Sequence, residues 1–133
     1  MTETLHIEIE PGDEFETRLA EKMRALDEDR TEELGDERVL SVPDEGTIER
    51  VLSEKNLELI RTAAREEPSS LRELARLVGR DIKNVSEATT ELEALGLLEF
   101  VREGRSKRPI VPYDEIEVTY AVRGDEDDGV LAA

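Results

Sequence analysis

The chain has 133 residues, which is the length of one domain with short attachments. It contains no cysteine and no run of about 18 apolar residues. Its N-terminus lacks the basic stretch followed by an apolar run that is typical of a secretory signal. Composition therefore excludes thiol chemistry and a disulfide framework, and we expect a cytoplasmic protein with no membrane partner. The net charge is -17, yet the apolar residues keep helical and strand periods, which favours a folded chain over a disordered one.

The first fifty residues predict a strand, a helix and a second strand. Apolar and polar residues alternate over 5–10, and a Pro-Gly pair ends this half-buried strand. A helix is expected over 13–29, and a short strand over 38–42 is stopped by Pro43. The helix has one apolar stripe, formed by Phe15, Leu19, Met23 and Leu26. We expect residues 1–50 to form a strand-helix-strand extension.

Three helices are predicted next. Residues 47–52 suit a short helical or irregular lead-in, and Ser53 is a credible N-cap for a helix that Pro68 ends. The apolar positions of this helix are Leu57, Ile60 and Ala64.

The following two helices are closely spaced. Ser70 and Glu73 fit a capping box at the start of a helix over 71–78, and Gly79 stands where it should stop. Asp81 caps a third helix, which Gly96 ends. The expected inward positions of the third helix are Ile82, Val85, Thr89, Leu92 and Leu95.

Strands dominate the remainder. Residues 97–102 and 108–112 predict two strands joined by the loop EGRSK, and 115–122 alternates as a further strand. The order predicts an α+β fold, a winged helix-turn-helix over 51–122 with the N-terminal extension before it. Residues 123–133 suit an acidic tail.

The helix pair presents a candidate DNA-reading surface. With one face of the third helix buried, the residues facing outward near its start are Arg80, Lys83, Asn84, Ser86, Glu87 and Thr90. In a helix-turn-helix this half enters the major groove, where Lys83 can donate to guanine and Asn84 can bind adenine bidentately. We expect Ser70 and Arg72 to contact the DNA backbone.

The loop between the two hairpin strands is locally basic. Four cations, Arg102, Arg105, Lys107 and Arg108, face a single carboxylate, Glu103, a local net charge of +3 over 102–108. An arginine-rich hairpin loop suits the minor groove or the adjacent backbone. Another reading is that these cations pair with the acidic N-terminal half of the chain.

The charge is unevenly distributed. Residues 1–50 have a net charge of -11, residues 51–110 are neutral and residues 111–133 have -6. The 4 lysines against 14 arginines, with many carboxylates, suit a protein adapted to molar salt, where the Debye length falls to about 3 Å. We expect potassium or other counterions at any interface with double-stranded DNA.

The segment SLRELARLVGRDIKNVSEATTELEALGLLEF (70–100) resembles the MarR-like winged-helix regulators of archaea, especially predicted haloarchaeal transcriptional regulators. The matching motifs are at 70–75, 79–85 and 95–99, and the similarity covers most of 5–122. The resemblance implies a DNA-binding regulator that acts as a dimer. Relatives often have a basic or aromatic residue after the Asn-Val pair, whereas this chain has Ser86, Glu87 and Ala88.

Two roles remain open for the stripe of Phe15, Leu19, Met23 and Leu26: a dimer interface, which we favour, or packing on its own domain. The strands over 5–10 and 115–122 are candidates for a shared sheet. The rival function is a protein-interaction module with a winged helix, either a transcription-apparatus adaptor or an acidic DNA mimic.

The sequence offers little for catalysis. The single histidine, His6, lies in a predicted strand and is expected at the surface. No carboxylate is set against a run of apolar positions that would raise its pKa, and the acidic residues 125–128 lack the spacing of a calcium loop. We expect no enzyme, no cofactor and no metal site.

Overall fold

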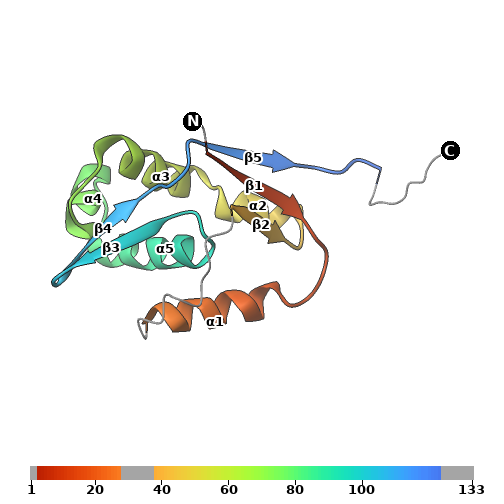
Figure 1. Ribbon diagram of the computed structural model, residues 1–133, viewed down its shortest axis with the longest axis horizontal. Coiled ribbons are helices and arrows are strands. Elements are labelled where there is room, and N and C mark those ends of the chain that lie inside the picture. Colours follow the sequence, from red (N-terminus) through yellow and green to blue (C-terminus); the bar gives the residue numbers. More distant parts are fainter. Residues whose placement is uncertain (1–2, 28–37, 124–133) are drawn as a thin grey trace.

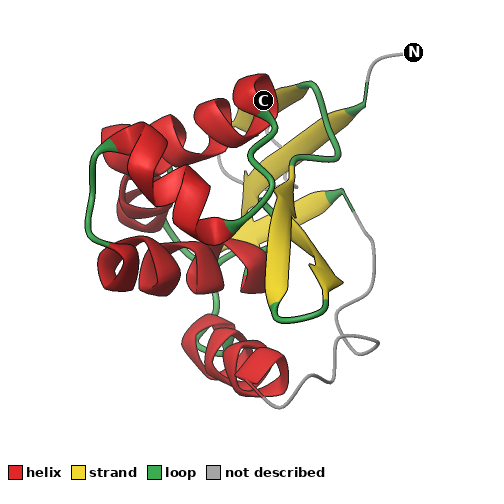
Figure 2. Cartoon of the chain, turned by 90° about the vertical axis from the view of Figure 1, so that its left-hand side faces the viewer, coloured by secondary structure: helices red, strands yellow, loops and turns green. Residues whose placement is uncertain are grey.

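The computed structural model describes residues 3–27 and 38–123, which contain five helices and five strands (Figure 1). The expected mixture of helices and strands is confirmed. The elements up to the helix pair are β1 (Thr4–Ile9), α1 (Phe15–Asp27), β2 (Val39–Val42), α2 (Glu45–Val51) and α3 (Glu54–Glu66). They are followed by α4 (Leu71–Val78), α5 (Ile82–Ala94), β3 (Glu99–Glu103), β4 (Ser106–Ile110) and β5 (Glu115–Thr119). In Figure 2 the helices gather largely on one side and the strands on the other.

A parallel sheet joins the two ends of the described chain. Its strand order is β2-β1-β5, and Ile7 is in register with Leu40 on one side and Val118 on the other. Leu5 and Ile7 are buried, whereas His6 and Glu8 are exposed, so the predicted alternation of the first strand is confirmed. The two strands proposed to share a sheet do so within one chain. β5 ends at Thr119, earlier than predicted.

The helix pair α4–α5 has the predicted N-caps, but the carboxylate of Glu73 accepts from the amide of Ser69 (2.7 Å) and not from that of Ser70, so the expected capping box forms only in part. The Ser70 hydroxyl accepts a hydrogen bond from the Glu73 amide (3.1 Å), and Asp81 accepts from the amides of Lys83 and Asn84. Gly79 ends α4 with a φ of 70°, a backbone conformation that is strained for any residue with a side chain. On α5, Val85, Thr89, Leu92 and Leu95 are buried and Ile82 is partly buried, as expected.

The helices before this pair differ in detail from the prediction. Ala64 is exposed, and the buried residues of α3 are Leu59, Ile60 and Ala63. The buried face of α3 is therefore wider than the predicted stripe and is rotated about the helix axis relative to it. The reason is that α3 packs against both α4 and β4. The lead-in is a regular helix, α2, whose N-cap Asp44 accepts from the Thr47 amide (2.8 Å).

The strands β3 and β4 lie nearer the hairpin tip than predicted, and the loop between them is shorter. Glu103 pairs with Ser106, so Gly104 and Arg105 alone form the turn. A two-residue hairpin turn requires a positive φ, which Gly104 supplies at 65°. Of the two cations expected in the loop, Lys107 therefore lies on a paired strand and Arg105 in the turn. Pairing fixes which face of the hairpin each strand cation occupies.

The extension is packed onto the helix pair. α1 lies against α5, and Phe15, Leu19 and Leu26 are buried within the chain, with Met23 partly buried against the same core. The stripe is therefore covered by its own domain, the second of the two roles considered. A dimer would have to use other residues. α2 spans residues 50 and 51, and β5 pairs with β1, so the segments 1–50 and 51–122 are joined by secondary structure.

Candidate nucleic-acid interface

The start of α5 presents a small polar surface. Lys83, Asn84 and Glu87 are exposed, whereas Ser86 and Thr90 are half-buried. The Thr90 hydroxyl donates to the Ser86 carbonyl (2.8 Å), so its hydrogen is directed along the helix and not outward. Lys83, Asn84 and Glu87 are thus the residues of this surface best placed to contact a partner.

Arg80 does not belong to this surface. Its guanidinium donates to the backbone carbonyl of Lys55 at the start of α3 (3.1 Å), and its Nε is buried without a hydrogen-bond partner among the described residues. The side chain is therefore turned back across the protein. The prediction that Arg80 faces outward beside Lys83 is wrong, because the short turn after Gly79 directs Arg80 toward α3.

The alternation of the hairpin places its cations on two faces. Arg102 is opposite Lys107 in the register and shares a face with Phe100, whose ring lies 4.5 Å from the Lys107 ammonium group. Arg108 lies on the other face and pairs with Glu103 (3.6 Å). The four predicted cations are therefore not one patch, since Arg108 is partly neutralised away from the other three.

A groove of about 420 Å³ lies between the hairpin tip and the starts of α4 and α5. Ser70, Arg72 and Ile82 are among the helix residues that line it, and four of its lining residues are basic while none is acidic. The basic residues are Arg72, Arg102, Arg105 and Lys107. Ser70 and Arg72, the residues predicted to contact the DNA backbone, thus line one groove with three of the four hairpin cations.

The chemistry of this groove suits a phosphate. Guanidinium groups bind phosphate oxygens bidentately, and an ammonium group adds a compact positive charge. Arg72 and Arg105 are exposed, so neither must be desolvated before it meets an anion. In a chain of net charge -17, a groove with four cations and no carboxylate is a local inversion of sign that can attract a polyanion.

One carboxyl group behind the hairpin was not anticipated. Glu93 of α5 is only 8% exposed, and burial raises its pKa, although Arg102 and Lys107 oppose the shift. The expectation that no carboxylate has an apolar setting is therefore wrong. Glu93 is buried because α1 and β3 cover that side of α5, and both are distant from it in sequence.

Other predictions concern residues away from the groove. His6 is exposed on β1, and its Nδ1 lies 2.9 Å from the carboxylate of Glu117 on β5. Within residues 3–27 and 38–123, no group of three or more potential ligands could hold a metal ion. Over the same residues, none of the helices has the length and apolar character to cross a membrane. The predicted acidic tail, from residue 124 on, lies outside the described residues.

Sequence reasoning missed a hollow beside α1 and β2 and the buried Tyr113. Tyr113 donates to the Leu97 carbonyl (2.7 Å) and so ties the segment before β5 to the turn between α5 and β3. A polar aromatic residue between two predicted strands was the available signal. The hollow, about 720 Å³, has no sequence signal because its walls come from four separate elements.

Comparison with known proteins places these elements in a family. A search of curated proteins found no match. A family model described as HVO_A0114 matches residues 51–118, just over half of the chain, from the end of α2 into β5. The matched region includes α4, α5, the β3–β4 hairpin and every residue that lines the basic groove. The chain belongs to the HVO_A0114 family.

Proposed function

We propose that the protein is a sequence-specific regulator of transcription that binds double-stranded DNA through a winged helix-turn-helix at high salt. In this proposal α3, α4 and α5 are the three helices, α5 enters the major groove, and the β3–β4 hairpin is the wing. The observation that supports it best is the basic groove between the wing tip and the starts of α4 and α5.

Each part of this surface has a separate task. Lys83 and Asn84, exposed at the start of α5, would contact base edges, while the groove would bind a backbone phosphate. Glu87, also exposed on α5, can accept a hydrogen bond from a cytosine amino group. The resemblance to MarR-like regulators and the neutral balance of residues 51–110 support the same function.

The acidic remainder of the chain determines the conditions of binding. Outside the groove, carboxylates such as Glu8 and Glu117 line the open face of the sheet and would repel DNA at low salt. In molar KCl the screening length is about 3 Å, so this repulsion acts only at close range. Potassium ions held between protein carboxylates and phosphates would reduce it further.

The test is a DNA-selection and mobility-shift assay in molar KCl with the wild type and Arg105→Ala/Lys107→Ala. We expect the wild type to enrich a defined sequence and the double variant to lose at least tenfold in affinity for it. Arg61→Ala/Arg65→Ala is the matched control, because it removes the same charge from exposed positions of α3 that do not line the groove. Similar losses in both double variants would show a general charge effect.

The salt dependence separates two mechanisms. A protein that displaces counterions loses affinity with a slope near -0.9 per neutralised phosphate, and removing two groove cations should make that slope shallower by about 1–2. If potassium is taken up between the acidic protein and DNA, the wild-type slope should be shallow or positive. No enrichment of any DNA sequence in molar KCl would refute the regulator and leave the rival protein-interaction module.

The dimer is part of the proposal and requires a new interface. Two copies would present two α5 helices to a two-fold symmetric site. The apolar stripe of α1 is covered within the chain. Among residues 3–27 and 38–123, the outer edges of β2 and β5 pair with no further strand, so we propose them as the interface. Val39 on β2 and Tyr120 beyond β5 are both about half exposed there. Light scattering in molar KCl measures the mass directly.

A further inference from the structure

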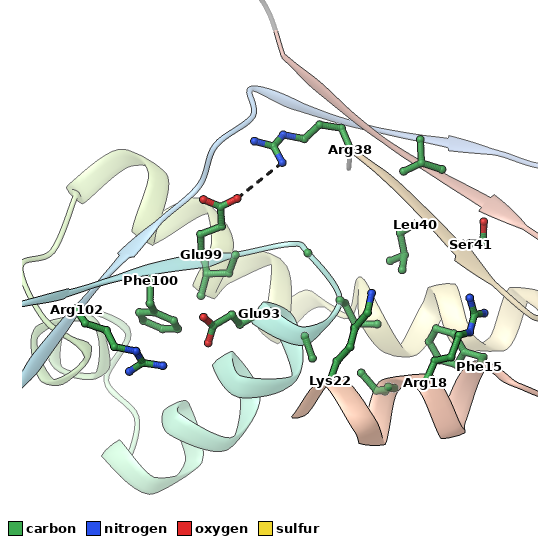
Figure 3. Close-up of a pocket in the computed structure, with 16 residues that line it drawn as sticks. Phe15, Arg18, Lys22, Arg38, Leu40, Ser41, Glu93, Glu99, Phe100 and Arg102 are labelled. Atoms are coloured by element: carbon green, nitrogen blue, oxygen red, sulfur yellow. Dashed lines mark ion pairs between the residues drawn. The ribbon is translucent and has the colours of Figure 1, made fainter. Parts of the chain in front are cut away.

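A buried carboxyl group lies beside the β3–β4 hairpin. Glu93 is in the last turn of α5 and is buried there, on the side of the helix that α1 and β3 cover. In Figure 3 its carboxyl group is directed toward Phe100 and Arg102 of β3. Burying a carboxylate is costly unless nearby cations compensate for the hydration that it loses. The charges around Glu93 therefore decide whether it carries a proton.

The cations that act on Glu93 come from the hairpin. Arg102 and Lys107 are register partners on the face of the hairpin that carries Phe100, and the Lys107 ammonium group lies 4.5 Å from the centre of the Phe100 ring. Burial raises the pKa of Glu93, the two cations oppose that rise, and Glu99 reinforces it. Removing either cation from the neighbourhood of Glu93 therefore favours its protonated form.

The other charged groups around Glu93 lie on three elements. In Figure 3 the α1 cations are at the opposite end of the hollow from Phe100, and Arg38, just before β2, pairs with Glu99 (3.8 Å). On α5 itself, Glu91 pairs with Arg50 of α2. The charged residues that line the same hollow as Glu93 are Arg18, Lys22, Arg38, Glu99 and Arg102.

Arg102 and Lys107 also belong to the basic groove. Both line it beside the starts of α4 and α5, and Arg102 lines the hollow with Glu93 as well. A phosphate in the groove and the carboxylate of Glu93 therefore compete for the same two cations. A DNA phosphodiester remains ionised at every pH at which a protein is folded, so the group that takes up a proton in this competition is the carboxyl group of Glu93.

We propose that Glu93 is a proton-linked positioning residue of the basic groove, so that the groove binds a polyanion with uptake of a proton at Glu93. When its carboxyl group is ionised, Glu93 holds Arg102 and Lys107 toward α5. When the carboxyl group is protonated, both cations are available to a phosphate. The regulation of DNA binding by pH rests on the proposed function, whereas the response of the groove to a polyanion without a base sequence does not.

This linkage predicts tighter binding at lower pH. A bound phosphate withdraws the compensating cations and adds negative charge, so the pKa of Glu93 is higher in the complex than in the free protein. Affinity is then greatest below both pKa values and falls as the pH rises from the free to the bound value. A difference of one unit between the two pKa values corresponds to about a tenfold change in affinity. Because Glu93 is buried, molar salt screens this coupling less than it screens exposed charges.

The coupling of Glu93 to the hairpin is measured first, without any polyanion. An NMR pH titration of side-chain carboxyl carbons in molar KCl follows Glu93, whose signal is the one that Glu93→Gln lacks. We expect Lys107→Gln to raise the pKa of Glu93. The matched control is Arg108→Gln, which removes the next cation along β4, on the opposite face of the hairpin, and should leave that pKa unchanged. Equal effects in the two variants, or no effect of Lys107→Gln, would overturn the positioning role.

The same titration with an excess of long-chain inorganic polyphosphate tests the competition without a base sequence. We expect the pKa of Glu93 to rise in the wild type, and to rise less in Lys107→Gln, which has already lost one of the shared cations. Duplex DNA should produce the same rise. A pKa of Glu93 that neither polyphosphate nor duplex DNA changes would overturn the proposal.

The effect on DNA affinity is measured by mobility shift in molar KCl. Between about pH 5 and pH 8 we expect the affinity of the wild type to fall at least threefold, which corresponds to about half a pKa unit, and that of Glu93→Gln to stay constant. Glu91→Gln, which removes another carboxyl group of α5, should behave as the wild type does. A pH dependence that persists in Glu93→Gln would belong to another group, such as His6, and would overturn the linkage.

The two proposals fail in different ways. If DNA binds with the same affinity at every pH, the linkage is wrong and the proposed function stands. If no DNA binds at any pH, the proposed function fails, and the polyphosphate titration by itself decides whether the groove takes up a proton at Glu93.

Discussion

The hydrogen bond from Tyr113 to Leu97 should contribute measurably to stability. The Tyr113 side chain is 7% exposed, and its hydroxyl donates to a backbone carbonyl of a residue that is fully buried. That carbonyl belongs to the turn from which the β3–β4 hairpin leaves α5. Tyr113→Phe removes the donor and leaves the ring in place, so the packing is preserved and one polar group loses its partner.

The size of the effect follows from the burial of the acceptor. A typical hydrogen bond contributes about 1 kcal/mol net, but leaving a buried carbonyl unsatisfied costs roughly 1–3 kcal/mol. No other donor to the Leu97 carbonyl occurs among residues 3–27 and 38–123. We therefore expect Tyr113→Phe to lower the free energy of unfolding by about 2 kcal/mol, which for a chain of this length lowers Tm by roughly 6–10 °C.

The chain supplies its own control. It has two tyrosines and no tryptophan, and the second tyrosine, Tyr120, is 52% exposed with no hydrogen bond from its hydroxyl in the described structure. Tyr120→Phe should change the free energy of unfolding by less than about 0.5 kcal/mol. Urea denaturation of the three proteins, followed by circular dichroism in molar KCl, measures the difference.

The same bond predicts a dependence on alkaline pH. Burial raises the pKa of Tyr113 in the folded protein, so above about pH 10 the unfolded chain loses its phenolic proton first. The free energy of unfolding of the wild type should then fall, while that of Tyr113→Phe should not fall for this reason. The difference in unfolding free energy between the two proteins should therefore become smaller. Equal stabilities of the two Phe variants at neutral pH would refute the reasoning, because the hydroxyl would then be satisfied equally well by water.

Two further predictions concern stability in molar KCl. Burial raises the pKa of Glu93, so ionisation of this carboxyl group destabilises the folded state as the pH rises through that pKa. We therefore expect Glu93→Gln to be more stable than the wild type at pH 7. Urea denaturation at about pH 4, where the carboxyl group is largely protonated, should show a smaller gain. An equal gain at both pH values would mean that charge is not the cause. Gly79→Ala should lose about 1–2 kcal/mol, because its φ of 70° disfavours a side chain, whereas Gly12→Ala, which has open space and no positive φ, should lose none. Similar thermal melting of these two variants would contradict the assignment of Gly79 as a strained helix end.

Local patterns predicted much of the fold. The caps at Ser53, Ser70 and Asp81 and the stop at Gly79 depend on residues within three or four positions of each other, and all of them form as expected. The apolar face of α5 followed from its 3.6-residue period for the same reason.

Features that depend on distant segments were predicted poorly. The turning of Arg80 toward Lys55 and the burial of Glu93 under α1 and β3 join parts of the chain that no local pattern relates. The prediction of one patch of hairpin cations failed for a different reason. The second strand was predicted to begin at residue 108 but begins at Ser106, so Lys107 and Arg108 are neighbours on one strand and point to opposite faces.

The pairing of β1 with β5 also constrains how the chain folds. Thr4 and Glu115 are partners, so this ladder closes a loop of more than a hundred residues. By contrast, β2 begins at Val39, far sooner after β1, and a two-residue turn joins β3 to β4. Entropy favours closing the short loops first, at a saving that grows with the logarithm of loop length. On the ribosome, β1 is made before the other four described strands, and its second edge is covered only after β5 has been made. Until then, the strand that will stand at the centre of the sheet is an edge open to other chains.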